Sequence, residues 1–148
     1  MYEPYRFTSH FNFHKKLKIT YPGNIKFAGQ KIYWNKQTIS EYFEPFFNWA
    51  KSNGISDNRI VNGEFGCYRR NKTCDQYLAD VISVLNSKNI HWAFYSFRED
   101  DWDGYDYEVG TGGLGWDYWK AKEAGKNPKR PRRDNKLFSI IKREFQKR

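Results

Sequence analysis

Three helical patterns alternate with two short strand-like runs, and this order limits what the chain can fold into. The strand-like runs cover residues 59–65 and 91–97, and each begins a few residues after a helical pattern ends. Such a β/α alternation favours a parallel sheet covered by helices. Residues 1–5 resemble the shortened end of another strand. Because no internal repeat or long low-complexity segment occurs, we expect one α/β unit.

Each helical pattern has an expected N-terminal cap. Thr38 and Glu41 have the spacing of a capping box before the first pattern, and Thr73 and Gln76 repeat this spacing before the second. Asp134 is the expected cap of the third pattern. Apolar residues then recur at helical intervals, so the sequence predicts three amphipathic helices that each bury one face.

The formal charge of +9 is concentrated at one end of the chain. From Lys126 onward, ten Lys or Arg residues stand against Asp134 and Glu144. This basic region, residues 126–148, carries a net charge of +8 and leaves about +1 for everything before it. A charge spread along a groove would indicate nucleic acid or another anionic surface. A basic C-terminal helix region explains the charge of this chain instead.

Membrane, disulfide and metal roles receive little support. No apolar run approaches the roughly 18 to 20 residues that span a bilayer, and residues 1–6 do not resemble a signal peptide. Cys67 and Cys74 are too few for a disulfide framework or a zinc site, and we expect two reduced thiols rather than a pair. His10 and His14 could share one helix face, but no third ligand lies nearby, so a loop is expected there. We expect no cofactor and no metal.

A carboxylate flanked by glycines ends the first strand-like run. Glu64 follows Gly63 and precedes Phe65 and Gly66. Reacting groups of β/α barrels lie at the carboxyl ends of strands, and glycine lets the backbone turn and a ligand approach. The alternative is that Glu64 opens a loop and is only solvated. The second run ends among aromatic and acidic side chains, which suit a polyhydroxylated ligand and favour a functional Glu64.

Three motifs, taken in order, resemble glycoside hydrolase family 5, the cellulase-like enzymes of clan A. Residues 63–66 match the nucleophile motif of the seventh barrel strand, residues 92–99 resemble the aromatic motif of the eighth, and residues 1–10 resemble the end of the sixth. The resemblance implies a partial (β/α)8 TIM barrel, approximately the sixth to eighth strands with their helices. A complete barrel needs roughly 250 residues. The resemblance therefore implies that residues 1–148 are a single C-terminal fragment.

The resemblance also implies roles for individual residues. Glu64 would be the nucleophile of a retaining glycosidase, and Tyr2 would be the tyrosine that contacts it. Tyr95 stands where many members carry a tryptophan that stacks on the sugar next to the cleaved bond. We expect Tyr95 to stack in the same way, with less ring area.

Four further residues are candidates for substrate binding. Trp92 belongs to the eighth-strand motif, although its place on the opposite face of the strand is typical of a packed core residue. Arg98, Glu99 and Trp102 are candidates for contacts to sugar hydroxyls. The alternative for these three is an exposed loop cross-linked by its own charges.

One catalytic group is missing from the resemblance. In family 5 the acid/base is the glutamate of an Asn-Glu-Pro motif on the fourth strand, and the sequence contains no Asn-Glu-Pro. The resemblance implies hydrolysis of a β-linked polysaccharide such as cellulose or mannan, with the chain inactive alone. The chain would be a truncated gene product or one part of a split enzyme that assembles with its missing N-terminal half. Family members are usually secreted or periplasmic, but the localisation of this chain stays open.

Two other function classes stay open as well. A non-catalytic carbohydrate-binding remnant would use Tyr95 and Trp102 as stacking surfaces without turnover. A basic module would bind RNA or DNA through residues 126–148 and would show a steep salt dependence. The first ranks above the second, and both rank below the enzyme fragment.

Overall fold

The computed structural model describes residues 1–98 and 102–146. These residues form helices and two small sheets of two strands each. The helices are α1 (Tyr5–Thr8), α2 (His10–His14), α3 (Lys36–Ser52), α4 (Cys74–Ser87), α5 (Trp116–Glu123) and α6 (Lys136–Phe145), with 3₁₀ turns η1 (Asp57–Arg59) and η2 (Tyr107–Val109). The strands are β1 (Gly23–Phe27), β2 (Gln30–Trp34), β3 (Val61–Asn62) and β4 (His91–Trp92).

Strands β3 and β4 pair in parallel, as the β/α alternation predicts, with Val61 opposite His91. Both strands are shorter than the predicted runs. Turn η1 occupies residues 57–59, and beyond the paired residues the two segments continue as loops. One bond still joins these loops, because the Tyr95 N–H donates to the Phe65 carbonyl at 2.8 Å. The short parallel pair therefore places the ends of both predicted strands side by side.

One expected strand is absent, and one pair of strands was not expected. Residues 1–5 form no strand, because the chain enters α1 directly after Pro4. The antiparallel hairpin of β1 and β2, with Ile25 opposite Ile32, was not predicted. Its turn contains Gly29 at φ +83°, a conformation that favours glycine. The sheets of the described residues are these two pairs, and they do not close into a barrel.

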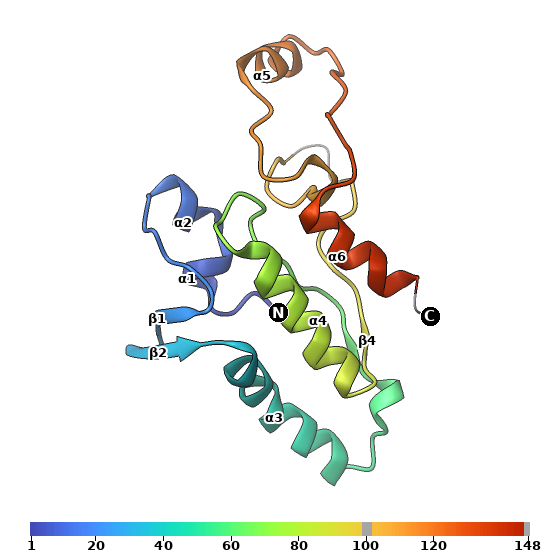
Figure 1. Ribbon diagram of the computed structural model, residues 1–148. Coiled ribbons are helices and arrows are strands. Elements are labelled where there is room, and N and C mark those ends of the chain that lie inside the picture. The colour runs from blue at the N-terminus through green and yellow to red at the C-terminus, as the bar shows by residue number, and fades with distance from the viewer. Residues whose placement is uncertain (99–101, 147–148) are drawn as a thin grey trace.

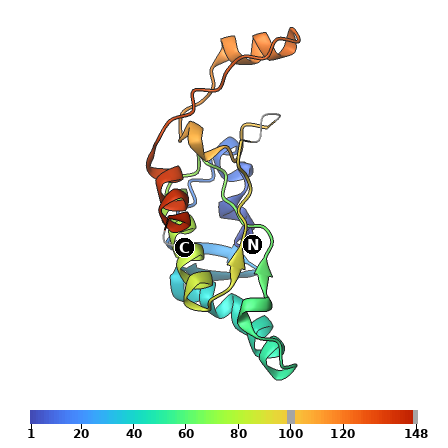
Figure 2. The same cartoon turned by 90° about the vertical axis from the view of Figure 1, so that its right-hand side faces the viewer.

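Helix α4 forms the centre of the core. Tyr77, Leu78, Val81 and Leu85 are fully buried and recur at the three- and four-residue spacing of one helix face. Figure 1 shows α4 between α3 and α6, and Figure 2 shows β3 and β4 along one side of these helices. Cys67 and Cys74 are free thiols within this core. The strand ends that carry the candidate site are thus supported by α4 and its neighbours.

The helix caps differ from the predicted ones. Asn35 caps α3 by accepting a hydrogen bond from the Thr38 N–H at 3.0 Å, because Thr38 already lies inside the first turn. Thr73 precedes α4 but makes no side-chain cap bond, and its Oγ1 instead accepts from the Tyr21 N–H at 3.0 Å. Asn135 caps α6 in place of Asp134. The three predicted helices are present as α3, α4 and α6, but their capping residues differ from the predicted ones.

A long excursion of the chain precedes α6, and the basic region begins on its returning part (Figure 1). Helix α5 lies at the far end of this excursion, away from the other helices (Figure 1, Figure 2). The chain then returns without regular structure through residues 126–135, and α6 packs against α4. Among the helices of the described residues, none is long and apolar enough to cross a membrane.

Candidate active site

Glu64 and Tyr2 are in direct contact, although they lie at opposite ends of the N-terminal half of the chain. Glu64 is exposed just beyond β3, and the Tyr2 hydroxyl donates a hydrogen bond to Glu64 Oε1. Burial, followed by this hydrogen bond, raises the pKa of Tyr2. Tyr2 therefore remains a neutral donor that fixes one oxygen of the carboxylate.

The backbone around Glu64 is held by close packing. Phe65 is fully buried, and its carbonyl accepts from the Tyr95 N–H. A Cβ on Gly66 would lie 2.8 Å from the Tyr95 carbonyl oxygen and 3.0 Å from the Tyr105 ring. Only glycine fits here without a shift of the neighbouring loop. This close approach explains why a glycine follows the strand end.

Tyr95 belongs to the same cluster as Tyr2. The rings of Tyr95 and Tyr105 meet edge to face at 5.4 Å, and the rings of Tyr105 and Tyr2 do so at 6.1 Å. The peptide bond between Tyr95 and Ser96 is cis. Tyr95 is half-buried beside Tyr105, which also contacts Tyr2. The structure therefore brings together three of the residues predicted for the site, Glu64, Tyr2 and Tyr95.

Tyr105 was missed by the sequence reasoning, although it connects the cluster to Trp102. Its ring lies 5.0 Å from that of Trp102, which is 41% exposed, and burial raises the pKa of Tyr105. Tyr105 lies in an irregular loop, where no periodic pattern marks a residue as facing the strand ends. Trp102 is thus placed near the site through a contact that the sequence does not indicate.

Trp92 lies in the core, which favours the packing interpretation over sugar binding. Its side chain is largely buried, its ring packs edge to face against Phe65 at 5.7 Å, and its indole N–H donates to Asn86 Oδ1 at 2.8 Å. The alternation of side chains along β4 turns Trp92 toward the helices. Trp92 is therefore a supporting residue in this structure.

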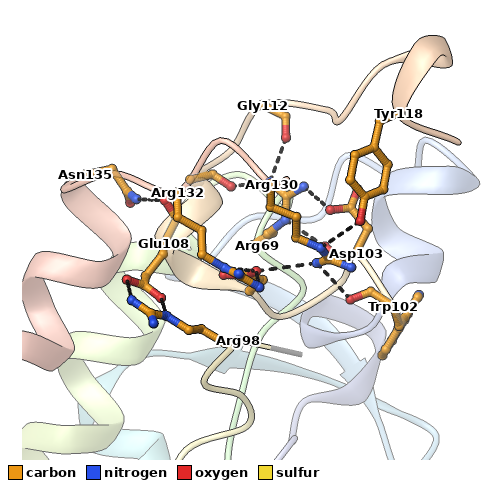
Figure 3. Close-up of polar contacts among 12 residues, drawn as sticks. Arg69, Arg98, Trp102, Asp103, Glu108, Gly112, Tyr118, Arg130, Arg132 and Asn135 are labelled. Atoms are coloured by element: carbon orange, nitrogen blue, oxygen red, sulfur yellow. Dashed lines mark hydrogen bonds and ion pairs between the residues drawn. The ribbon is translucent and has the colours of Figure 1, made fainter. Parts of the chain in front are cut away.

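Arg98 is engaged within its own loop. Its Nε lies 2.7 Å from Glu108 Oε2, and its Nη2 lies 3.2 Å from the other carboxylate oxygen, so the pair is bidentate (Figure 3). This geometry matches the alternative of a loop cross-linked by its own charges. Glu99 lies outside the described residues.

A buried arginine holds the loop that carries Trp102 and Tyr105. The guanidinium of Arg69 forms an ion pair with Asp103 and donates to the carbonyls of Asp103 at 2.7 Å and Gly112 at 2.6 Å (Figure 3). The Arg69 side chain is fully buried. Because the partners lie more than thirty residues away along the chain, local sequence patterns could not reveal this contact.

The basic region is tied to the same loop. Arg132 Nε donates to Asp106 Oδ2 at 2.9 Å, and Arg130 Nη1 lies 3.5 Å from the same oxygen (Figure 3). Lys136 pairs with Asp75, and Lys142 pairs with Asp134 at 3.1 Å. Part of the positive charge of residues 126–148 is thus neutralised within the fold.

The expected loop at His10 and His14 is wrong, since these residues form α2. Their rings lie 5.9 Å apart, and His14 Nε2 is 3.2 Å from the Tyr68 hydroxyl. Within residues 1–98 and 102–146, no group of three or more His, Cys, Asp or Glu side chains could hold a metal ion.

The site is thus a tyrosine-bound glutamate just beyond a parallel strand of an α/β protein, with aromatic rings beside the tyrosine. A family model described as cellulase (glycosyl hydrolase family 5) matches residues 1–101. The chain belongs to glycosyl hydrolase family 5, a family of TIM-barrel glycoside hydrolases whose substrates are polysaccharides. No curated protein matches the chain. The matched region contains Glu64, Tyr2 and Tyr95, whereas Trp102 and Tyr105 lie beyond it.

Proposed function

We propose that the chain supplies the nucleophilic half of a retaining β-glycosidase, with Glu64 as the nucleophile. The hydrogen bond from Tyr2 to Glu64 carries the proposal, because it orients one carboxylate oxygen and leaves the other toward solvent. In the first step, a Glu64 oxygen forms a bond to the anomeric carbon while the glycosidic C–O bond breaks. The departing oxygen takes the electron pair and receives a proton from a general acid.

The general acid comes from outside this chain in our proposal. The sequence lacks the Asn-Glu-Pro motif of the family, so the leaving oxygen has no matched proton donor. Loss of a general acid lowers the rate by about 10² to 10⁴. We infer that residues 1–148 correspond to the last strands of the barrel, that they act with an N-terminal portion, and that they are nearly inactive alone.

The exposed apolar surface supports such a missing portion. Tyr42, Phe46 and Trp49 are exposed along α3, and Val61 is exposed on β3. A two-stranded parallel sheet is typically covered on both faces and extended at its edges. Further strands and helices of the same barrel would cover this surface.

The proposed substrate is a β-linked glucan or mannan. Tyr95 and the exposed ring of Trp102 would stack on sugar faces, since aromatic rings offer apolar area with polar edges. Arg98 and Glu99 are the further residues that we propose for contacts to sugar hydroxyl groups. The pair of Arg98 with Glu108 would have to open or share its donors for that contact.

A trapping experiment tests the nucleophile without requiring the missing acid. The reagent is a dinitrophenyl β-cellobioside with fluorine replacing the hydroxyl next to the anomeric carbon. Dinitrophenolate departs without protonation, and fluorine slows hydrolysis of the glycosyl-enzyme. We expect the intact mass to rise by one fluorocellobiosyl group, and peptide mapping to place this group on Glu64.

Two variants make the result specific. Glu64→Gln should abolish labelling, whereas Glu41→Gln, which changes an exposed carboxylate on α3, should label like the unaltered chain. Labelling at another carboxylate, or labelling that persists in Glu64→Gln, would refute the assignment of the nucleophile.

A non-catalytic carbohydrate-binding remnant is the second candidate, and the exposed ring of Trp102 favours it. It predicts that binding of cellohexaose survives Glu64→Gln and that no label is trapped. The nucleic-acid alternative is disfavoured, because Arg130, Arg132 and Lys136 pair with acidic residues of the fold.

A further inference from the structure

A cavity of about 520 Å³ lies between α2, the loop that follows it and the segment after Tyr68. Its lining includes Lys16, Lys18, Arg70 and Lys72, and it includes no acidic residue. We call this feature the basic cavity. It lies outside the C-terminal basic region, so it is a second concentration of positive charge that the net charge of the sequence does not reveal.

The lysine-bearing wall of the basic cavity is preformed. Asn12 is buried and clamps the loop by two bonds: its Nδ2 donates to the Ile19 carbonyl at 2.8 Å, and its Oδ1 accepts from the Ile19 N–H at 3.1 Å. Lys16 and Lys18 both adopt left-handed backbone conformations, with φ of 51° and 56°. The loop therefore turns tightly at both lysines. Little ordering cost remains for the backbone when a ligand binds.

The charges of the basic cavity are not compensated within the part of the chain that the structure describes, where none of its four basic residues forms a salt bridge. The Arg70 guanidinium stacks over the Phe13 ring at 4.2 Å. This stacking holds the cation in place while leaving edge donors for a ligand.

Two lining residues also have buried polar atoms without a hydrogen-bond partner among the described residues, namely Arg70 Nε and Asn71 Oδ1. Asn71 Nδ2 donates to the carbonyls of Phe7 at 2.5 Å and Ser9 at 2.9 Å, which fixes the orientation of its amide. Buried polar atoms normally find partners. Both atoms are themselves closed to solvent, so the direct contacts to a ligand in this cavity fall to the exposed lysines Lys16, Lys18 and Lys72.

A row of aromatic rings connects the basic cavity to Glu64. Beginning at Tyr2, the row continues through Tyr105, Trp102 and Tyr68 to Phe13, in four ring-to-ring steps of 5.0 to 6.4 Å. Tyr2 donates to Glu64 at one end, and Arg70 covers Phe13 at the other. The two sites are therefore within reach of one extended oligosaccharide.

We propose that the basic cavity binds an anionic sugar residue of the same glycan whose bond lies at Glu64. The anionic group is a uronic acid carboxylate or a sulfate ester, since both are recognised by clustered Lys and Arg. The inference deepens the proposed function and rests on it, because it assigns an acidic glycan as the substrate class. The connection to Glu64 favours a glycan over nucleic acid.

Binding of three matched hexasaccharides to the 148-residue chain tests the proposal: cellohexaose, cellohexaose with its primary hydroxyls oxidised to carboxylates, and sulfated cellohexaose. Calorimetry at low salt should give at least about tenfold tighter binding of an anionic hexamer than of the neutral one. Comparison of the two anionic arms identifies the anionic group. The variant K16Q/K18Q/K72Q should remove this preference. The control variant K51Q/K126Q/K129Q loses the same charge from exposed lysines elsewhere and should keep it.

The outcomes separate this inference from the proposed function. An anionic preference that disappears only in K16Q/K18Q/K72Q supports the basic cavity, even if no label is trapped on Glu64. Equal affinity for all three hexamers, or no binding of any, overturns it, even if labelling of Glu64 succeeds. Equal losses in both triple variants, or tighter binding of oligo(dT) that depends on the same lysines, also overturn it.

Discussion

Replacing Arg69 with methionine should destabilise the fold by about 3–5 kcal/mol, the usual cost of removing one partner from a buried ion pair. Arg69 is fully buried, while the Asp103 side chain is 12% exposed. Methionine keeps the length of the side chain but has no donors, so it leaves the Asp103 carboxylate unpaired. The carbonyls of Asp103 and Gly112, now bound at 2.7 and 2.6 Å, also lose their donor. These losses share one site and are not additive.

Urea unfolding followed by circular dichroism measures the effect. Arg98→Met is the matched control, because Arg98 also pairs with a carboxylate, Glu108, but its side chain is 55% exposed. Solvent screening makes that loss much smaller than the loss at the buried pair. At this chain length, the larger loss should lower Tm by roughly 6–20 °C. If Arg69→Met costs no more than Arg98→Met, the inference that Arg69 anchors the loop of Trp102 and Tyr105 is wrong.

Three further predictions concern titration, backbone space and core packing. Burial raises the pKa of Tyr2, Tyr77, Tyr105 and Tyr107. Their stabilising contribution is therefore complete below the unfolded pKa of about 10 and is lost as pH rises from there through the higher pKa of the folded state. Phenolate absorbance should therefore appear at a higher pH in native protein than in urea-unfolded protein. Gly66→Ala should lower the free energy of unfolding, measured in urea, by about 1–3 kcal/mol, because the added Cβ would lie 2.8 Å from the Tyr95 carbonyl oxygen. Gly63→Ala is the control and should cost clearly less, because a Cβ there would meet open space. Trp92→Phe should lower the free energy of unfolding by about 1–2 kcal/mol, because it removes the hydrogen bond to Asn86, and it should leave the rate of Glu64 labelling unchanged. Slower labelling without a loss of stability would show instead that Trp92 takes part in the site.

Local patterns in the sequence predicted the elements better than their ends. The helical spacing around Leu78 and Val81 predicted α4, and the alternation of elements predicted the parallel pairing of β3 with β4. The predicted capping residues were wrong because Asn35 and Asn135 can cap a helix as well as the nearby Thr38 and Asp134 can. Which residue becomes the cap depends on where the first helical turn begins. The hairpin of β1 and β2 was not predicted, because its turn at Gly29 lies outside the three motifs on which the resemblance rests.

The site was only partly predictable for a related reason. Glu64, Tyr2 and Tyr95 belong to motifs that follow one another along the chain, so a resemblance could find them. Tyr105 and Arg69 act through partners far away in sequence, in loops without periodicity. Contacts of this kind depend on the final path of the chain, which local propensity does not specify.

The part of the chain beyond residue 101 is structurally continuous with the matched part, although the family match stops there. Asp103 is bound by Arg69 from the matched part, and Asp106 is bound by Arg130 and Arg132 from the returning basic region. The loop between these anchors places Tyr105 against Tyr2 and Tyr95, beside Glu64. Because charge pairs on both sides hold this loop, the basic region contributes to the geometry of the candidate active site. Arg130, Arg132 and Lys136 have this structural role, because each pairs with an acidic residue outside the basic region.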